Sequence, residues 1–85
     1  MAEKYETNML AMIEAINRNA GGQIWPQYLR DEYRGLNGNP ADFSKVLGWV
    51  MTRWPGAVEL VTIATPGRLI QVMVKIHKTI DPEKI

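Results

Sequence analysis

The chain has 85 residues, with 10 Lys and Arg, 9 Asp and Glu and a formal net charge of +1 at pH 7. This length accommodates one small domain, and the near-balance of charge argues against a strongly basic nucleic-acid module. The sequence has no cysteine and one histidine, which excludes disulfides, a thiol nucleophile and zinc sites built from thiolates or several histidines. An apolar core must therefore stabilise the domain.

Nothing in the sequence resembles a signal peptide or a membrane span. Charged residues interrupt the first 20 positions, and the apolar runs are far shorter than the ~20 residues of a membrane helix. We therefore expect no membrane partner. We expect residues 1–85 to be a single domain cut from a larger protein, with a core spanning about residues 7–77.

The first predicted element is a helix from about Thr7 to Asn19. Thr7 or Asn8 is expected to cap its start, and Gly21-Gly22 to end it. Its apolar positions form one stripe at the helical spacing i, i+3, i+4, i+7: Met9, Met12, Ile13 and Ile16. Such a stripe indicates a core-facing helix.

A second helix is predicted from Pro26 to about Arg34, after a short extended segment at residues 23–25. Proline is favoured at the first position of a helix because its missing N–H has no partner there in any case. The apolar positions are expected to face inward: Leu29, Tyr33 and Leu36. The opposite side carries polar side chains of both signs: Gln27, Arg30, Asp31 and Arg34.

A third helix is predicted from about Pro40 or Ala41 to Trp54, where Pro55-Gly56 stops it. Its inward positions follow the helical period closely: Phe43, Val46, Leu47, Val50, Met51 and Trp54. Its outer side carries two cations, an aromatic side chain and a threonine: Lys45, Trp49, Thr52 and Arg53.

The period then changes from that of a helix to that of a strand. Residues 57–64 and 69–76 are rich in β-branched side chains, and Thr65-Pro66-Gly67-Arg68 between them has the signature of a type II turn. One face of the second strand is expected to be buried: Ile70, Val72, Val74 and Ile76. The other is expected to be wet: Gln71, Met73, Lys75 and His77.

The tail, residues 78–85, contains Asp81-Pro82-Glu83, which has the pattern of a helix start. Helix, short strand, helix, helix and hairpin is the order of a winged helix-turn-helix. The sequence therefore predicts an α+β fold with three helices, a β-hairpin wing and a short strand between the first two helices.

Signals for catalysis are weak. The chain has no glycine-rich phosphate loop, its lone serine, Ser44, has no nucleophile context, and His77 has no acidic partner implied by the sequence. We expect a binding module rather than an enzyme, with no catalytic residue, metal or cofactor.

Two kinds of partner compete for this module. A winged helix can place its third helix in a DNA groove, and the candidate nucleic-acid contacts are cationic: Lys45, Arg53, Arg68 and Lys75. Asp42, at the start of that helix, would repel phosphate. The mixed charge of the second helix is typical of a solvated face or of a specific protein interface. Trp25, Trp49 and Met73 are expected to be partly exposed, and an exposed Trp can anchor an interface.

The region around the second helix resembles a known family. Gly21-Gly22-Gln23-Ile24 and the run from Leu29 through Glu32-Tyr33-Arg34 to Gly38 are similar to the LOTUS, or OST-HTH, domain of Oskar and of tudor-domain-containing germline proteins. The similarity continues through the third helix and the first wing strand: Phe43, Val46, Val50, Met51, Pro55, Val58 and Leu60. Asp42 departs from the family, which often has glycine before this aromatic. The resemblance covers about residues 8–76.

The resemblance implies a non-catalytic adaptor found in the cytoplasm, in germ granules of the perinuclear or nuage type. Extended LOTUS domains bind the C-terminal RecA-like lobe of a Vasa-type DEAD-box helicase through the second helix and a further helix after the wing. By this analogy Gln27, Arg30, Asp31 and Arg34 face the helicase, and the helix started by Asp81 completes that surface. Minimal LOTUS domains are associated with RNA, including G-quadruplex RNA, which keeps structured RNA open as the alternative partner; duplex DNA is less favoured.

A third alternative is self-association through the wing. The second wing strand presents Gln71, Met73 and Lys75, and its outer edge is expected to be free to pair with a copy of itself.

Overall fold

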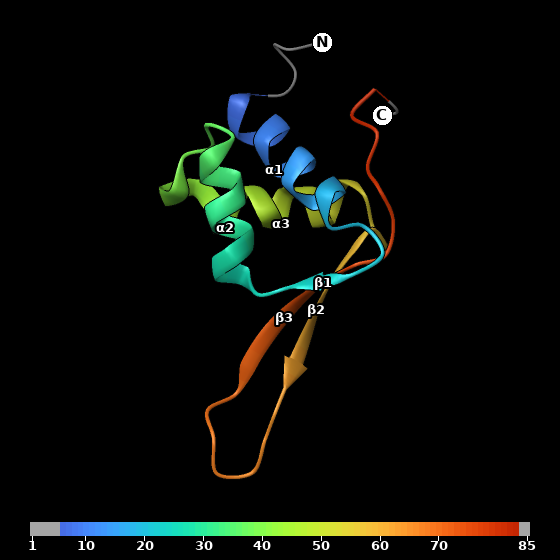
Figure 1. Cartoon of the computed structure of the whole chain (residues 1–85). Helices are drawn as coiled ribbons and strands as arrows, with labels where there is room; N and C mark the ends of the chain where they lie inside the picture. The colour runs from blue at the N-terminus through green and yellow to red at the C-terminus, as the bar shows by residue number, and fades with distance from the viewer. Residues whose placement is uncertain (1–5, 84–85) are drawn as a thin grey trace.

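The computed structural model describes residues 6–83, which form three α-helices, one 3-10 helix and three β-strands. The helices gather at one end, and a β-hairpin projects from them as a wing (Figure 1). The elements follow in this order: α1 (Thr7–Arg18), β1 (Gln23–Ile24), α2 (Pro26–Gly35), the 3-10 helix η2 (Pro40–Asp42), α3 (Phe43–Arg53), β2 (Val58–Ile63) and β3 (Gln71–Ile76). This order confirms the predicted α+β class and the winged-helix arrangement.

Helix α1 begins directly after Glu6, whose side chain makes no capping hydrogen bond. The predicted cap by Thr7 or Asn8 is therefore wrong. Asn8 lies inside the first turn, where its side chain joins α1 to the segment before α3. Its Nδ2 donates to Asp42 Oδ2 at 3.2 Å, and its Oδ1 accepts from the backbone N–H of Asn39 at 2.9 Å.

Helix α2 starts at Pro26, as predicted, and ends at Gly35. The chain reaches it from α1 by turning at Gly21, whose φ is 84°, and then running through β1. Trp25 is still extended, with φ −67° and ψ 142°, so Pro26 occupies the first helical position.

The third predicted helix consists of two elements. Asn39 begins the 3-10 helix η2, since its side chain accepts a hydrogen bond from the N–H of Ala41 at 3.0 Å. Asp42, with ψ of 6°, interrupts the α geometry, and the regular helix α3 starts only at Phe43. It ends at Arg53.

The three strands form an antiparallel sheet in the order β1-β3-β2. β3 pairs with β2 along its whole length and with β1 at Val74 and Lys75. At the tip of the wing Arg68 N–H donates to Thr65 O at 3.0 Å, and Gly67 has φ 78°. The predicted type II turn is confirmed, because its third position requires a positive φ.

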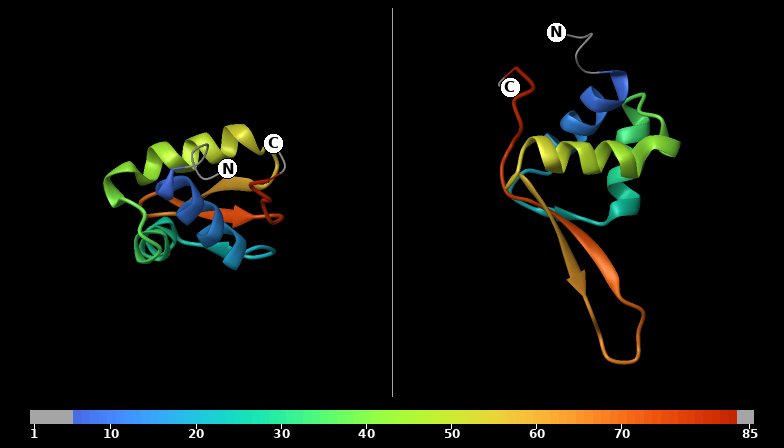
Figure 2. Two further views of the ribbon diagram at one scale, coloured as in Figure 1. Left: turned by 90° about the horizontal axis from the view of Figure 1, so that it is seen from above. Right: turned by 180° about the vertical axis from the view of Figure 1, so that it is seen from behind.

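The core lies between the three helices and the base of the hairpin (Figure 2). The buried side chains include the predicted inward positions of each helix: Met9, Met12, Ile13, Ile16, Leu29, Tyr33, Phe43, Val46, Leu47 and Val50. Leu36, Met51 and Trp54 pack against this core while remaining partly exposed.

The predicted burial of β3 is right at its base and wrong towards its tip. Val74 and Ile76 are buried, but Val72 and Ile70 are 39% and 67% exposed, while Met73, which was expected to be exposed, is 8% exposed. The hairpin extends past the helices (Figure 1), so the face that is buried at its base has nothing to cover it further out. Met73 points to the other face, where Val61 lies opposite it.

The tail after β3 turns back along the helices. Ile80 is buried, and the Asn17 side chain of α1 holds it by two hydrogen bonds, Nδ2 to Ile80 O at 2.9 Å and Ile80 N to Oδ1 at 2.7 Å. Asp81 Oδ1 accepts from the N–H of Glu83 at 2.9 Å, as in the predicted helix start. The continuation of that predicted helix at residues 84–85 lies outside the described residues.

Candidate protein-interaction surface

The four polar residues predicted to contact a partner share the outer side of α2. Gln27, Arg30, Asp31 and Arg34 follow the spacing i, i+3, i+4, i+7, which brings them onto one stripe of a helix, and all four are exposed. The opposite side of α2 is anchored in the core. We call this stripe the α2 face.

The charges of the α2 face are mixed and only partly paired. Arg34 Nη2 lies 3.6 Å from Asp31 Oδ1, and both side chains are exposed, so this pair contributes little to stability. Arg30 has no ion-pair partner within residues 6–83. The helix as a whole carries two cations and two carboxylates, the second being Glu32.

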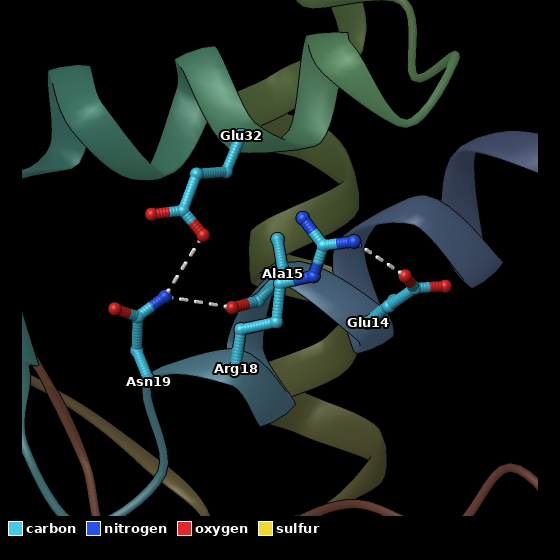
Figure 3. Close-up of polar contacts among 5 residues, drawn as sticks. All are labelled: Glu14, Ala15, Arg18, Asn19 and Glu32. Carbon is cyan, nitrogen blue, oxygen red and sulfur yellow. Dashed lines mark hydrogen bonds and ion pairs between the residues drawn. The ribbon is translucent and has the colours of Figure 1, made fainter.

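Glu32 belongs to the contact between helices α1 and α2 rather than to the α2 face (Figure 3). Asn19, just after the end of α1, donates from Nδ2 to Glu32 Oε1 at 3.1 Å and to the carbonyl of Ala15 at 2.9 Å. In the same region Arg18 pairs with Glu14 at 2.9 Å on the exposed side of α1. Glu32 therefore fixes the orientation of α2 against α1.

Tyr33 is fully buried, as its predicted inward position requires. The hydroxyl donates to the carbonyl of Asn39 at 2.8 Å, which satisfies it inside the domain. Burial of the phenol, helped by the nearby Asp42 carboxylate, raises the pKa of Tyr33, and the hydrogen bond to Asn39 partly opposes this. Gly38 packs so close to the ring that a Cβ there would lie 2.4 Å from it.

A surface hollow of about 450 Å³ lies beside the α2 face. Its walls come from the start of α2 and from the segment that begins α3: Pro26, Gln27, Arg30, Pro40, Ala41, Phe43 and Ser44. Two of the predicted contact residues, Gln27 and Arg30, thus share a concave site with residues about 15 positions further along the chain. No sequence pattern marks Ser44, Pro40 or Ala41 as site residues, because only the folded path of residues 36–42 brings them here.

The four candidate nucleic-acid contacts do not form one surface. Lys45 and Arg53 are exposed on α3, on either side of Trp49, which is 46% exposed. Arg68 lies at the tip of the wing, next to the turn. Lys75 alternates with the buried Val74 and Ile76, so it projects from the sheet face turned away from the core.

The wing is a second distinctive surface because its outer half is apolar and exposed. Of the large apolar side chains, Leu69 is 90% exposed, and three others on the hairpin are also exposed: Leu60, Ile70 and Val72. Within residues 6–83, β2 has an open outer edge along its whole length. β3, for which a free edge was predicted, is covered by β1 at Val74 and Lys75 and keeps that edge open only at residues 71–73. Trp25 and Trp49 are partly exposed, as expected, while Met73 is not.

The described residues contain a histidine–carboxylate pair but no metal-binding cluster and no membrane-spanning helix. No cluster of three His, Cys, Asp or Glu side chains that could hold a metal occurs within residues 6–83. His77 Nε2 lies 2.7 Å from Glu59 Oε1 on the exposed sheet face, where the two form a surface pair. None of the helices in this part of the chain is long and apolar enough to span a bilayer.

No family model matches the sequence, and neither a curated protein nor a solved structure matches it.

Proposed function

We propose that this domain is a non-catalytic adaptor that binds a Vasa-type DEAD-box RNA helicase through the α2 face, at its C-terminal RecA-like lobe, in germ granules. The observation that carries the proposal is the exposure of all four residues, Gln27, Arg30, Asp31 and Arg34, on one stripe of a helix whose other side is locked in the core. The LOTUS resemblance supplies the identity of the partner.

The chemistry of the α2 face suits a protein partner. Both signs of charge lie within two helical turns, and such a pattern selects a complementary surface rather than a uniformly charged one. Tyr28, on the same helix, is 53% exposed and adds an aromatic side chain of the kind enriched at interface hot spots.

The described part of the tail, up to residue 83, does not extend the α2 face. Figures 1 and 2 place α2 and residues 80–83 on opposite sides of α1, and Asn17 fixes Ile80 to that helix. The proposed contact therefore rests on α2 itself.

Two double charge reversals, each exchanging two cations for two glutamates, test the proposal. Arg30→Glu with Arg34→Glu alters the α2 face, and Lys45→Glu with Arg53→Glu is the matched control on α3. We expect the first to weaken binding of the isolated RecA-like lobe at least about tenfold, and the second to leave it within about twofold, in a calorimetric titration. Equal losses from both pairs would contradict the α2 assignment, and no binding by the unaltered domain would contradict the helicase partner.

A second candidate function is RNA binding through α3. Trp49 is 46% exposed between Lys45 and Arg53, and an aromatic ring flanked by cations suits an unpaired base and its phosphates. This function predicts that the α3 reversal abolishes binding of single-stranded or G-quadruplex RNA and that the affinity falls steeply with salt. RNA affinity that is independent of salt would exclude it.

Self-association through the wing is favoured by its exposed apolar side chains and by the open edge of β2. Leu60→Lys places a charge on β2, and Leu69→Lys, in the loop that leads to β3, is the control. If two copies pair along β2, sedimentation at two concentrations will show a dimer that the first change abolishes and the second leaves in place. A monomer at both concentrations would contradict this mode of pairing.

A further inference from the structure

We propose that the hollow between α2 and α3 receives an acidic side chain of a protein partner, with Arg30 binding its carboxylate. This inference rests on the proposed function of the α2 face and names the chemistry that the face recognises. It starts from the charge of the hollow: among its described lining residues, Arg30 is the one charged side chain.

The carboxylates next to the hollow in sequence are both directed elsewhere. Asp31 pairs with Arg34 at 3.6 Å along the helix surface. Asp42 accepts a hydrogen bond from Asn8 Nδ2 at 3.2 Å, which directs it towards α1. Arg30 thus keeps an uncompensated positive charge, while Arg34, one turn further along α2, has a partner within the domain.

The remaining walls suit a side chain with an apolar stem and a polar end. Pro26, Pro40 and Phe43 supply apolar surface, and the two prolines present no backbone donor. The Gln27 amide and the Ser44 hydroxyl add neutral hydrogen-bond donors beside the guanidinium, which can bind a carboxylate in bidentate geometry. A glutamate, with its methylene stem and carboxylate end, fits this combination.

A nucleic-acid backbone fits the hollow less well than a single carboxylate. A phosphate chain would carry its repeated charges past Asp31 and Asp42, and like charges brought together weaken binding. An acidic side chain presents one charge at one point and meets Arg30 alone. The inference therefore commits to a protein partner.

A titration with short peptides tests the hollow without requiring the natural partner. The probes are N-acetylated, C-amidated Gly-Gly-Glu-Gly-Gly and its Gln counterpart, added to the 15N-labelled domain at low ionic strength, where charge interactions are least screened. We expect the Glu peptide to shift the backbone amide signals of Gln27, Arg30 and Ser44. Arg30→Gln should reduce these shifts at least about fivefold, and the matched control Arg34→Gln should change them less than about twofold.

Three results would overturn the inference: equal shifts with the Gln peptide, equal sensitivity to the two arginine changes, or a stronger response of the same signals to oligouridylate than to the Glu peptide. The last would assign the hollow to nucleic acid. Binding of the helicase lobe is measured separately on the same variants. If the domain binds the Glu peptide but not the helicase lobe, the helicase proposal is refuted and the carboxylate site stands. If the domain binds the lobe equally well with and without Arg30→Gln, the carboxylate site is refuted and the helicase proposal stands.

Discussion

The helical body and the wing of this domain use apolar residues in opposite ways. In the body, large side chains such as Met12, Leu29 and Tyr33 are fully buried, and the exposed large ones stand singly on different helices: Leu10, Tyr28 and Trp49. In the wing, residues 60–74 contain a single charged side chain, Arg68, yet four large apolar side chains of the hairpin are exposed. Burial on folding accounts for most of the large apolar residues of the body, whereas those of the outer wing gain less from it. Exposed apolar surface of this kind is typical of an interaction site.

The two regions therefore suggest two kinds of recognition. The α2 face lies on the body, where mixed charges and a hollow can select a partner by complementarity. The wing offers apolar area and an open strand edge, which favour strand pairing with little selection by charge.

The largest expected effect comes from removing a ring from the body. Tyr33→Ala should lower the free energy of unfolding by about 3–5 kcal/mol, because it leaves a cavity at the centre of the core. Tyr28→Ala is the matched control, since Tyr28 is on the same helix but exposed, and it should cost less than about 1 kcal/mol. Urea unfolding followed by circular dichroism measures both. Similar losses of unfolding free energy from the two changes would contradict the assignment of Tyr33 to the core and Tyr28 to the surface.

A glycine in the body is expected to tolerate no side chain. Gly38→Ala would place a Cβ 2.4 Å from the buried Tyr33 ring, and this overpacking should cost about 1–3 kcal/mol. Gly35→Ala, at the end of α2, meets no atom within 4 Å and should be neutral or stabilising by up to about 1 kcal/mol. The same unfolding measurement compares them, and a stable Gly38→Ala variant would contradict the close packing of Tyr33.

The burial of the Tyr33 hydroxyl should cause a loss of unfolding free energy at alkaline pH. Its pKa is raised in the folded state above the ordinary value of 10.0, so its contribution to stability is complete below pH 10 and is lost as the pH rises through the folded pKa. Tyr33→Phe should lack this part of the alkaline loss, whereas Tyr28→Phe should retain it. Unfolding free energies at a series of pH values from 8 to 11 provide the comparison; identical slopes in the two variants would argue against a buried phenol.

The smallest effect is expected in the wing. Leu69→Asn removes an apolar side chain that is 90% exposed, so the free energy of unfolding should change by less than about 0.5 kcal/mol. A loss of unfolding free energy above about 1 kcal/mol would show that the outer wing packs against the body. It would contradict the difference proposed between the two regions. Thermal or urea unfolding of a dilute sample, where pairing of copies is minimal, is the appropriate measurement.

The sequence predicted the body better than the wing for a physical reason. A helical period identifies the side that faces a core, and the inward positions of all three helices are buried or pack against the core. Strand alternation shows which residues share a face but not whether anything covers that face. Val74 is buried because the helices reach it, while Val72 on the same strand and Ile70 just before it lie beyond them. Which of these residues are buried depends on how far the wing extends past the body, and no local sequence pattern encodes that length.

The candidate site was predictable in part. The spacing of Gln27, Arg30, Asp31 and Arg34 places them on one side of a helix once Leu29 and Tyr33 are assigned to the core. The hollow was not predictable, because only the folded path of residues 36–42 brings Ser44 to the same hollow as Arg30. The four cationic residues predicted to contact nucleic acid do not lie together, because they belong to a helix, a turn and the outer sheet face.

The most direct test of the proposed adaptor function is amide hydrogen exchange of the whole chain with and without the RecA-like lobe of a Vasa-type helicase. The proposal predicts that the lobe slows exchange in residues 26–35 and at the start of α3, and leaves the wing and the second half of α3 unchanged. Slower exchange confined to the wing or to residues 49–53, or no change anywhere at saturating lobe, would contradict it.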